Sequence, residues 1–486
     1  MKLKNKNLLH SQSFIENKWV DVESNTSFEV INPATGDVII NVADCNVTET
    51  GKAIDAASAA FESWSKKTAK DRADILRRWY NLIIENADDL ALIMTTEQGK
   101  PLAEAKGEVI YGASFVEWFA EEGRRIYGDV IPTPSNSKRI ITIKQPIGVV
   151  AAITPWNFPI SMITRKVSPA LAAGCTVVVK PPSETPLCAL ALAELGMQAG
   201  FPAGVINMIT TKDSKGVGKL MTEHEQVKKV SFTGSTEVGK VLMSQAASTI
   251  KKVSFELGGN APLIVFDDAD IDQAVKGAIA SKYRNAGQTC VCTNRLFVQE
   301  SIYEKFIQEY SQAVAALKVG EGTEEGVEIG PLITPKAVEK VQRLLNDAAS
   351  KGGKITMGGK QTKQGGLFFE PTIIEGCNAS MDLSKEEIFG PISAIYKFST
   401  EEEAIQTAND TSYGLAAYFF SQNINRVWRV AEALEYGMVG INEGIISHAE
   451  APFGGVKQSG IGREGSKYGI EDYVEIKYLC LGGMDR

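Results

Sequence analysis

Apolar residues change their spacing near residue 140 of the chain. Between residues 48 and 67 they recur every three or four positions, the period of a helix with one buried face. Asp71 is the candidate N-cap of a second helix that runs through Ile84, and a third helix ends near Gly99. The pattern predicts that the first third of the chain is helical.

After residue 140, short runs rich in valine and isoleucine alternate with helical segments, which is typical of parallel strands buried on both faces. The predicted strands are 149–154, 176–180, 205–209 and 230–232, and a second series follows at 261–265, 295–298 and 392–398 and continues to about Gly440; the predicted helices are 161–173, 187–199 and one from about Glu237. We expect an α/β fold with a doubly wound, Rossmann-like sheet and a second α/β domain. Ligands of such sheets bind beyond the carboxyl ends of the strands.

Two segments, 139–144 and 473–481, alternate apolar and polar residues instead. Alternation without a helical crossover predicts a small β arm or a sheet edge that pairs with another strand. Its partner is another subunit in one interpretation. In the other, the segment forms a surface hairpin within the chain.

Composition narrows the class of protein. The chain has 486 residues, enough for two or three domains, and its net charge of −8 argues against a nucleic-acid partner. No apolar run approaches the roughly 20 residues that cross a bilayer, and the basic N-terminus has no hydrophobic segment of signal-peptide length. The 7 cysteines are scattered and only 3 histidines are present, which predicts no disulfide framework, no metal site and a cytoplasmic protein.

The segment 285–292 places Cys290 among small and polar residues, where a substrate could reach its thiol. A thiol becomes a covalent nucleophile when a neighbouring group takes its proton. No histidine has a neighbourhood that suggests a base, so we expect a carboxylate. Glu256, followed by Gly258 and Gly259, is the candidate because apolar neighbours would raise its pKa. A solvated glutamate at a loop entry is the competing interpretation.

Further positions suggest an oxyanion site and a nucleotide site. Asn157 stands between two aromatic residues and two prolines, and a stiffly held amide can donate to an oxyanion. Gly234 and Ser235 lie in a GxxxxG turn, which suits a phosphate but is not the GxGxxG of dinucleotide folds. Lys180 and Ser183 can hold a ribose 2′-phosphate. Plain turns and an exposed strand-end lysine are the competing interpretations.

Together these pieces resemble the aldehyde dehydrogenase superfamily from about residue 15 to 483. The matching motifs, in the family's order, are PWNFP (155–159), KPPSETP (180–186), FTGSTEVG (232–239), FELGG (255–259), GQTC (287–290), EEIFGP (386–391) and PFGG (452–455). The resemblance implies a homo-oligomer, a dimer or a tetramer. It also implies a nicotinamide-dinucleotide-binding domain (1–122 and 146–255), a catalytic domain (256–455) and a small β oligomerisation arm (123–145 and 456–486).

The resemblance also implies residue roles. Cys290 would be the nucleophile, Glu256 the base that hydrolyses the thioester, and Asn157 the oxyanion donor. Ser183 stands where members that prefer NAD often carry glutamate, so NADP is the expected cofactor, with NAD as a second one because of Glu184. The residues implied to contact the cofactor are Ile153, Thr154, Trp156, Lys180, Ser183, Gly218, Gly234, Ser235, Glu387 and Phe389.

Within the superfamily, the segments around Arg165, Arg284 and Ser447 resemble the succinate-semialdehyde dehydrogenase branch, whose matching residues bind the substrate carboxylate. Two arginines near a thiol are costly to desolvate without an anionic partner, although ordinary salt bridges would explain either one alone. We expect a small aldehyde that carries a carboxylate. His448 is less typical of the branch, so glutarate semialdehyde or a broad set of aliphatic aldehydes is the alternative. A cysteine hydrolase is the alternative from another class.

Cys292 belongs to the same branch pattern, in which some members form a disulfide between the residues that match Cys290 and Cys292. On an extended chain the two Cα atoms would lie about 6.6–6.8 Å apart, at the upper edge of disulfide geometry. Closure would therefore need a local bend. A small packing residue is the competing interpretation.

Overall fold

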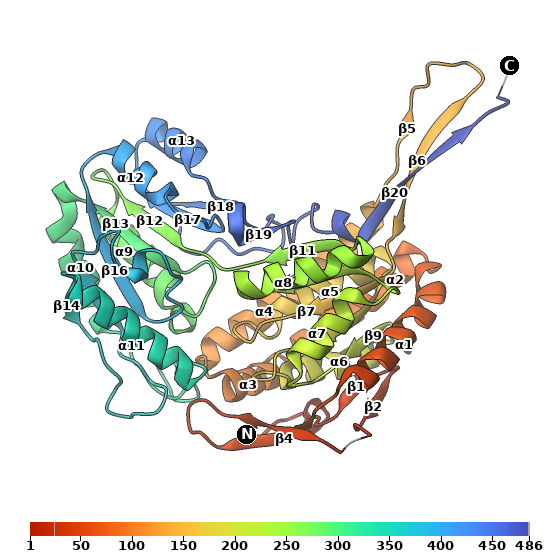
Figure 1. Ribbon diagram of the computed structural model, residues 1–486, viewed down its shortest axis with the longest axis horizontal. Helices are drawn as coiled ribbons and strands as arrows, with labels where there is room; N and C mark the ends of the chain where they lie inside the picture. The colour runs from red at the N-terminus through yellow and green to blue at the C-terminus, as the bar shows by residue number, and fades with distance from the viewer. Residues whose placement is uncertain (24, 485–486) are drawn as a thin grey trace.

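The computed structural model describes residues 1–23 and 25–484. Figure 1 shows two bodies, each built around a sheet with helices packed on it, and a β arm that projects from one of them. Each body has its own apolar core, the first formed largely by residues before 210 and the second by residues 261–453. This α/β architecture is the fold class that the sequence predicts.

The first sheet has the strand order β19-β11-β10-β7-β8-β9-β1-β2. Its central strands, β11 to β9 in that order, run parallel, whereas the outer strands are antiparallel to their neighbours. The strands are β1 (Ser13–Ile15), β2 (Lys18–Val20), β7 (Val149–Ile153), β8 (Thr176–Lys180), β9 (Ile206–Met208), β10 (Val227–Thr233), β11 (Lys252–Glu256) and β19 (Gly460–Ile461). β19 comes from the range that we assigned to the arm, so part of that range completes this sheet.

The helices of this body are α1 (Val47–Ser65), α2 (Ala69–Glu85), α3 (Ala87–Gln98), α4 (Leu102–Glu122), α5 (Ser161–Ala173), α6 (Leu187–Ala199), α7 (Ser214–Glu223) and α8 (Thr236–Ala246). The expected N-cap of α2 at Asp71 is wrong. Thr68 is the N-cap, and its hydroxyl accepts a hydrogen bond from the Asp71 backbone N–H at 3.1 Å. The Asp71 carboxylate accepts in return from the Thr68 backbone N–H, which completes a capping box.

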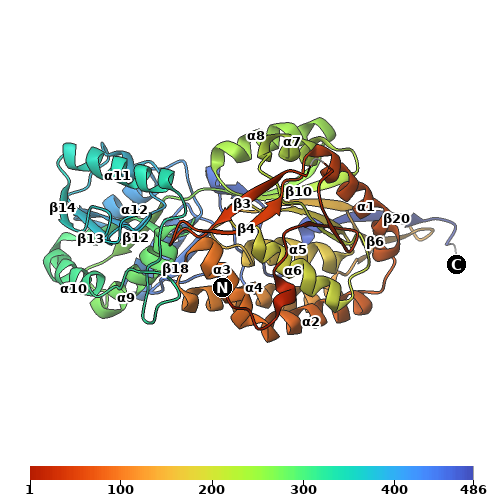
Figure 2. The ribbon, with the colours of Figure 1, turned by 90° about the horizontal axis from the view of Figure 1, so that it is seen from below.

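The prediction of a helical first third is also wrong for its beginning. In addition to β1 and β2, the segment before α1 contains the hairpin strands β3 (Ser27–Ile31) and β4 (Val38–Ala43), which Figure 2 shows lying across the first body. β1 and β2 each have 3 residues, too few to display a period of two. β3 does alternate between exposed and buried positions.

The second sheet has the order β14-β15-β16-β13-β12-β17-β18, and all neighbours are parallel except β14 and β15. Its strands are β12 (Ala261–Val265), β13 (Thr293–Gln299), β14 (Lys354–Met357), β15 (Thr372–Glu375), β16 (Ile392–Phe398), β17 (Ala416–Phe420) and β18 (Met438–Ile441). Its helices are α9 (Ile271–Tyr283), α10 (Tyr303–Ala315), α11 (Pro335–Ser350), α12 (Glu401–Asn409) and α13 (Ile424–Ala433). A linker of only four residues joins β11 of the first sheet to β12 of the second.

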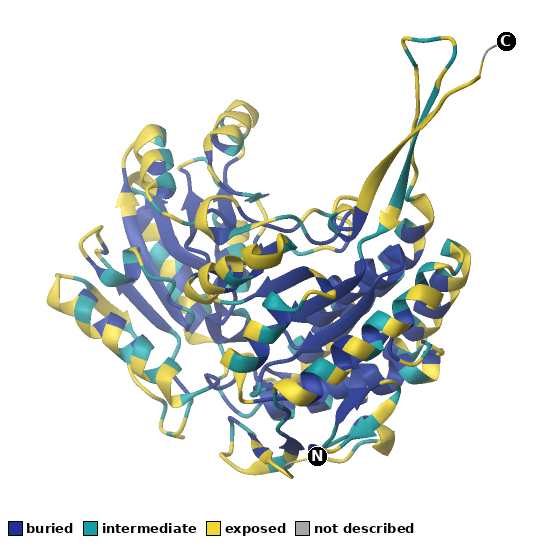
Figure 3. Cartoon of the chain, turned by 45° about the vertical axis from the view of Figure 1, so that its right-hand side comes forward, coloured by how far each residue is buried: buried dark blue, intermediate teal, exposed yellow. Residues whose placement is uncertain are grey.

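The arm is a three-stranded antiparallel sheet in the order β20-β6-β5. Its strands are β5 (Val130–Ile131), β6 (Arg139–Pro146) and β20 (Val474–Leu481). The two alternating segments of the sequence therefore pair with each other within one chain. Every residue of β20 after Val474 is exposed, and Figure 3 shows the arm in yellow and teal beside the dark-blue sheets. Across the described residues, no helix is long and apolar enough to cross a membrane.

Candidate active site

A cavity of about 270 Å³ opens where the two bodies meet, at the carboxyl end of β10. It brings together residues that are far apart in the sequence, and the predicted nucleophile is one of them. Its lining residues are Pro155, Trp156, Asn157, Thr233, Gly234, Ser235, Leu257, Gly258, Cys290, Ala337, Lys340, Glu387 and Phe389. The sequence singled out most of these positions; Ala337 and Lys340, on α11, carry no motif that would have identified them.

The backbone before Cys290 is held in an unusual conformation. Asn285 and Ala286 both have left-handed φ angles, 54° and 55°, which cost a non-glycine residue about 1 to 2 kcal/mol each. Buried hydrogen bonds hold Asn285 in place: its backbone N–H donates to the Glu104 carboxylate at 2.9 Å, and its side-chain carbonyl accepts from Gln98 at 2.9 Å. The first body therefore fixes the loop that carries the thiol.

Close packing against a glycine turn fixes the other side of this loop. A side chain at Gly259 would place its Cβ 2.3 Å from the Cys290 carbonyl oxygen, so only glycine fits there. The Gly259 N–H donates to the Glu387 carboxylate at 3.1 Å, and burial raises the pKa of Glu387 to about 7. The absence of a side chain at Gly259 therefore lets this turn lie against the loop that carries Cys290.

Cys290 is half-buried, and its surroundings keep the thiol protonated. Burial raises the pKa of the Cys290 thiol to about 12, while the positive charge of Arg165 acts in the opposite direction. A thiol in this state needs a proton acceptor before it can attack a carbonyl carbon.

Glu256 is the last residue of β11 and is buried, with its Oε2 atom unpaired among the described residues. Burial, followed by the negative charge of Glu464, raises its pKa well above the ordinary carboxyl range, although Arg165 and Lys166 lower it. The competing interpretation of a solvated loop glutamate is therefore wrong. The free oxygen and the raised pKa are the properties of a general base.

Asn157 is also buried, and its side-chain amide donates to the Gln288 carbonyl at 3.0 Å. An amide has two N–H donors, so the second remains available to an oxyanion beside Cys290. The backbone carbonyl of Asn157 accepts hydrogen bonds from the Lys100 ammonium at 2.8 Å and from the Asn285 side-chain amide at 3.0 Å. The loop is therefore anchored from both of its flanks.

The cofactor side of the cavity fits a nucleotide. The hydroxyls of Thr154 and Thr233 lie at the carboxyl ends of β7 and β10, buried and without partners among the described residues. A Cβ on Gly234 would approach the Phe232 ring to 2.4 Å, so the turn before α8 stays bare. The Ser235 hydroxyl is the N-cap of α8. Unpaired donors beside a bare turn suit the phosphates and ribose of a dinucleotide.

The remaining predicted cofactor residues come from both bodies. Ile153 ends β7, Gly218 lies buried in α7, and the Trp156 and Phe389 rings meet edge-on at 5.6 Å. Lys180 is buried rather than exposed, and burial lowers its pKa. A buried ammonium that donates a long hydrogen bond of 3.5 Å to the Pro181 carbonyl favours a site for an anion over a solvated lysine.

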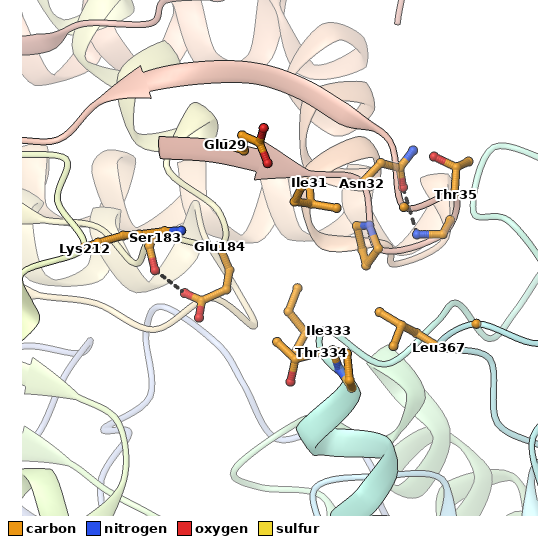
Figure 4. A pocket seen from close by; sticks show the side chains of 15 residues that line it. Glu29, Ile31, Asn32, Thr35, Ser183, Glu184, Lys212, Ile333, Thr334 and Leu367 are labelled. Atoms are coloured by element: carbon orange, nitrogen blue, oxygen red, sulfur yellow. Dashed lines mark hydrogen bonds between the residues drawn. The ribbon is translucent and has the colours of Figure 1, made fainter. Parts of the chain in front are cut away.

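Ser183 lines a second cavity, of about 500 Å³, under the β3–β4 hairpin. Figure 4 shows Ser183, Glu184 and Lys212 on one wall of it, facing Ile333 and Thr334. The Ser183 hydroxyl donates to the Glu184 carboxylate at 3.2 Å. Ser183 and Glu184 therefore line this cavity as a hydrogen-bonded pair.

Arg165 has an anionic partner within the chain, as the alternative of an ordinary salt bridge predicts. It lies buried on α5, forms an ion pair with Glu464, and stacks over the Phe453 ring at 4.1 Å. Lys166 forms an ion pair with the same carboxylate, whose pKa these charges lower. Even so, Nη2 of Arg165 has no hydrogen-bond partner among the described residues. Glu464 was visible in the sequence only as part of a matching tail, without a chemical signal of its own.

Arg284 and Ser447 are both half-buried. The Arg284 guanidinium lies over the Phe158 ring at 5.4 Å, and its charge lowers the pKa of the Cys290 thiol. The structure therefore brings Arg165 and Arg284 into the electrostatic range of the same sulfur.

Cys292 does not lie on an extended chain. Its backbone N–H donates to the Thr289 carbonyl at 3.1 Å, so residues 289–292 form a turn. Its buried thiol accepts a hydrogen bond from the Lys282 ammonium at 3.3 Å, and all 7 cysteines are free. The chain is therefore bent here, and the Cys292 sulfur interacts with Lys282.

A half-buried thiol, a buried carboxylate and a nucleotide cavity at the end of a doubly wound sheet define an oxidoreductase that works through a covalent thiol intermediate. The chain belongs to the aldehyde dehydrogenase family, whose model matches residues 19–479. This membership excludes the alternative of a cysteine hydrolase, and the family uses NAD or NADP.

Several known proteins match this chain along nearly its whole length. The NADP-dependent succinate-semialdehyde dehydrogenase of Escherichia coli K12 is 59% identical, covering 99% of this chain and 100% of its own. A glutarate-semialdehyde dehydrogenase of Pseudomonas aeruginosa is 58% identical over 100% of both chains. The crystal structure of a succinate-semialdehyde dehydrogenase from Burkholderia pseudomallei, at 58% identity, superposes with a TM-score of 0.98 and covers 99% of this chain and 100% of its own.

Proposed function

We propose that this enzyme oxidises succinate semialdehyde to succinate with NAD(P), with NADP preferred. The observation that carries the substrate class is the buried, unpaired Nη2 of Arg165 near Cys290, because a guanidinium edge in that position suits a carboxylate. Arg284 and Ser447 supply the other contacts. The names of the similar enzymes support the same substrate.

In the proposed reaction, the Cys290 thiol loses its proton to solvent water and the thiolate attacks the aldehyde carbon. The second N–H of Asn157 and the backbone N–H of Cys290 stabilise the oxyanion. Thr154, Gly234 and Ser235 would hold the nicotinamide cofactor, which would serve as the oxidant for the hydride lost from the aldehyde carbon. A thioester then remains on Cys290, and Glu256 takes a proton from the water that hydrolyses it and releases the acid.

Comparing charged with uncharged substrates tests the proposal. We expect kcat/KM for succinate semialdehyde to exceed that for an uncharged aldehyde of equal length by roughly 30-fold or more, the value of a buried charge contact. Arg284→Met should remove most of that advantage and leave the uncharged aldehyde nearly unaffected. Equal kcat/KM values for the two aldehydes in the wild-type enzyme would disprove the substrate assignment.

Glutarate semialdehyde is the second candidate, since a relative with that name is 58% identical. It is one methylene longer, and a methylene is worth only about 1–3 kcal/mol of discrimination. The same panel with glutarate semialdehyde decides between them by the ratio of kcat/KM values.

The NADP preference rests on Ser183 and on the buried ammonium of Lys180. Glu184 opposes it, because its carboxylate accepts from Ser183 and would repel a 2′-phosphate. We therefore propose that NADP is preferred and NAD is also accepted.

We also propose that the enzyme is a homo-oligomer, a dimer or tetramer, assembled through the arm in the cytoplasm. The exposed strand β20 supports the first part, since an open edge strand can pair with another chain. The seven free cysteines support a reducing compartment.

A further inference from the structure

The Tyr111 hydroxyl is a buried polar atom that makes no hydrogen bond among the described residues. The ring lies on α4 and packs edge-on against Phe115, with centroids 5.0 Å apart. A buried hydroxyl without a partner costs about 1–3 kcal/mol, whereas a phenylalanine ring would fill the same space without that cost. The Ser447 side chain is close enough to act on the phenol as a hydrogen-bonding group and to lower its pKa, but among the described residues it makes no hydrogen bond of ordinary geometry with it, so the hydroxyl is free to donate to a ligand.

Neighbours on both sides locate Tyr111 within the molecule. One helical turn before it, the Glu108 carboxylate accepts hydrogen bonds from the Ile160 and Ser161 backbone N–H groups, at 3.0 and 3.2 Å. Ser161 begins α5, the helix that carries Arg165. One turn after Tyr111, the Phe115 ring lies within 3.2 Å of where a side chain at Gly465 would begin. Tyr111 therefore faces the region of Arg165 and its partner, the neighbour of Gly465.

The charges around Tyr111 agree with this location. Burial raises the pKa of the Tyr111 phenol, while Arg165, Arg284 and the Ser447 hydroxyl favour its ionised form and Glu464 opposes it. The hydroxyl thus stands among the three groups proposed to hold the substrate carboxylate. It remains a neutral O–H donor at physiological pH, because the net shift of its pKa is upward.

Arg165 and Tyr111 therefore present two buried donors, Nη2 and the phenol O–H, that lack partners within the described chain. We propose that Tyr111 is a specificity-determining residue whose hydroxyl donates a hydrogen bond to the carboxylate of the substrate. This inference rests on the proposed function, and it adds a neutral donor from α4 to the two arginines and the serine. A neutral donor fixes the direction of the carboxylate without adding another charge that must be desolvated.

Tyr111→Phe tests the inference, because it removes only the hydroxyl. We expect kcat/KM for succinate semialdehyde to fall about tenfold, mainly through KM, and kcat/KM for an uncharged aldehyde of equal length to change less than twofold. The matched control is Tyr127→Phe, which removes the hydroxyl of an exposed tyrosine and should change neither value. An equal loss for both aldehydes, or no loss for the charged one, would overturn the role of Tyr111.

Two further measurements separate this inference from the proposed function. Succinate binding to the Cys290→Ser enzyme, followed by calorimetry, should weaken about tenfold when Tyr111→Phe is added. The Tm of ligand-free Tyr111→Phe should equal or exceed that of the wild type, because an unpaired hydroxyl is lost; a lower Tm would reveal a structural partner and overturn the inference. If the wild type itself shows no preference for the charged aldehyde, the proposed substrate is wrong, and the Tyr111 inference falls with it.

Discussion

At the scale of single residues, burial favours the protonated forms of both reactive groups of the site. Burial raises the pKa of Cys290 to about 12 and that of Glu256 well above its usual range. The base form of a carboxyl group with a raised pKa is populated only at higher pH. Turnover should therefore rise as pH increases through a value above the ordinary carboxyl range of about 4.3, rather than level off near it. The pH profile of kcat measures where this rise occurs.

Glu256→Gln should separate the two halves of the reaction. We expect one equivalent of NAD(P)H per active site to form in a burst, because the thiol still attacks the aldehyde. Steady-state turnover should then fall by about 10² to 10⁴, because the water lacks its base. Rapid-mixing absorbance measures both phases, with Glu225→Gln, an exposed residue, as the control. Loss of the burst as well would place Glu256 in thiol activation instead.

Ser183→Glu should reverse the choice of cofactor. A second carboxylate beside Glu184 would repel the 2′-phosphate of NADP, so kcat/KM for NADP should fall about tenfold or more, and the value for NAD should change little. Steady-state kinetics with both cofactors checks this, and Ser301→Glu adds the same charge at an exposed position elsewhere. An unchanged ratio of the two kcat/KM values would show that Ser183 does not face the ribose.

At the scale of elements, the turn after β11 positions the nucleophile. Gly259→Ala would put a methyl group 2.3 Å from the Cys290 carbonyl oxygen, so the two loops must separate. We expect a loss of about 1–3 kcal/mol of unfolding free energy and a fall in kcat. Gly107→Ala is the matched control, since nothing lies within 4 Å of its added methyl and α4 should gain about 0.5–1 kcal/mol. Denaturant unfolding and kcat measure both variants, and normal kcat in Gly259→Ala would contradict this role.

The sequence predicts the bounds of some helices and strands and misses others. α5 and β8 could be predicted with the bounds that they have in the structure, because apolar residues mark each of these buried segments along its length. β1 escaped notice because three residues define no period. The sequence does not distinguish Asp71 from Thr68 as the N-cap of α2, because threonine and aspartate both favour that position. The backbone shows that Thr68 occupies it.

The sequence alone likewise identifies some residues of the candidate site and not others. Cys290, Glu256 and Asn157 stand in motifs that the sequence displays. The ion pair of Arg165 with Glu464 joins residues 299 positions apart, and nothing local in the sequence indicates that they meet. Tyr111 lies in an ordinary helical pattern, and only its unpaired hydroxyl in the folded chain distinguishes it.

At the scale of the whole molecule, the arm exposes apolar side chains that a single chain does not cover. Ile476, Tyr478 and Val130 are 67%, 60% and 81% exposed. If the arm joins subunits, Ile476→Lys with Tyr478→Lys should dissociate the oligomer, whereas Lys477→Gln between them should not. Sedimentation velocity measures the mass of each variant. An unchanged oligomer in the double variant would show that assembly uses another surface.

The pairing of β20 with β6 also has a consequence for synthesis. Lys144, on β6, forms an ion pair with Glu471, which is 327 positions further along the chain. At about 5–20 residues per second, the ribosome needs roughly 15 to 65 seconds to make the intervening chain. During that interval β6 has left the ribosome without its partner strand. Nascent chains therefore cannot complete the arm, or any assembly that depends on it, until β20 (Val474–Leu481) has been synthesised.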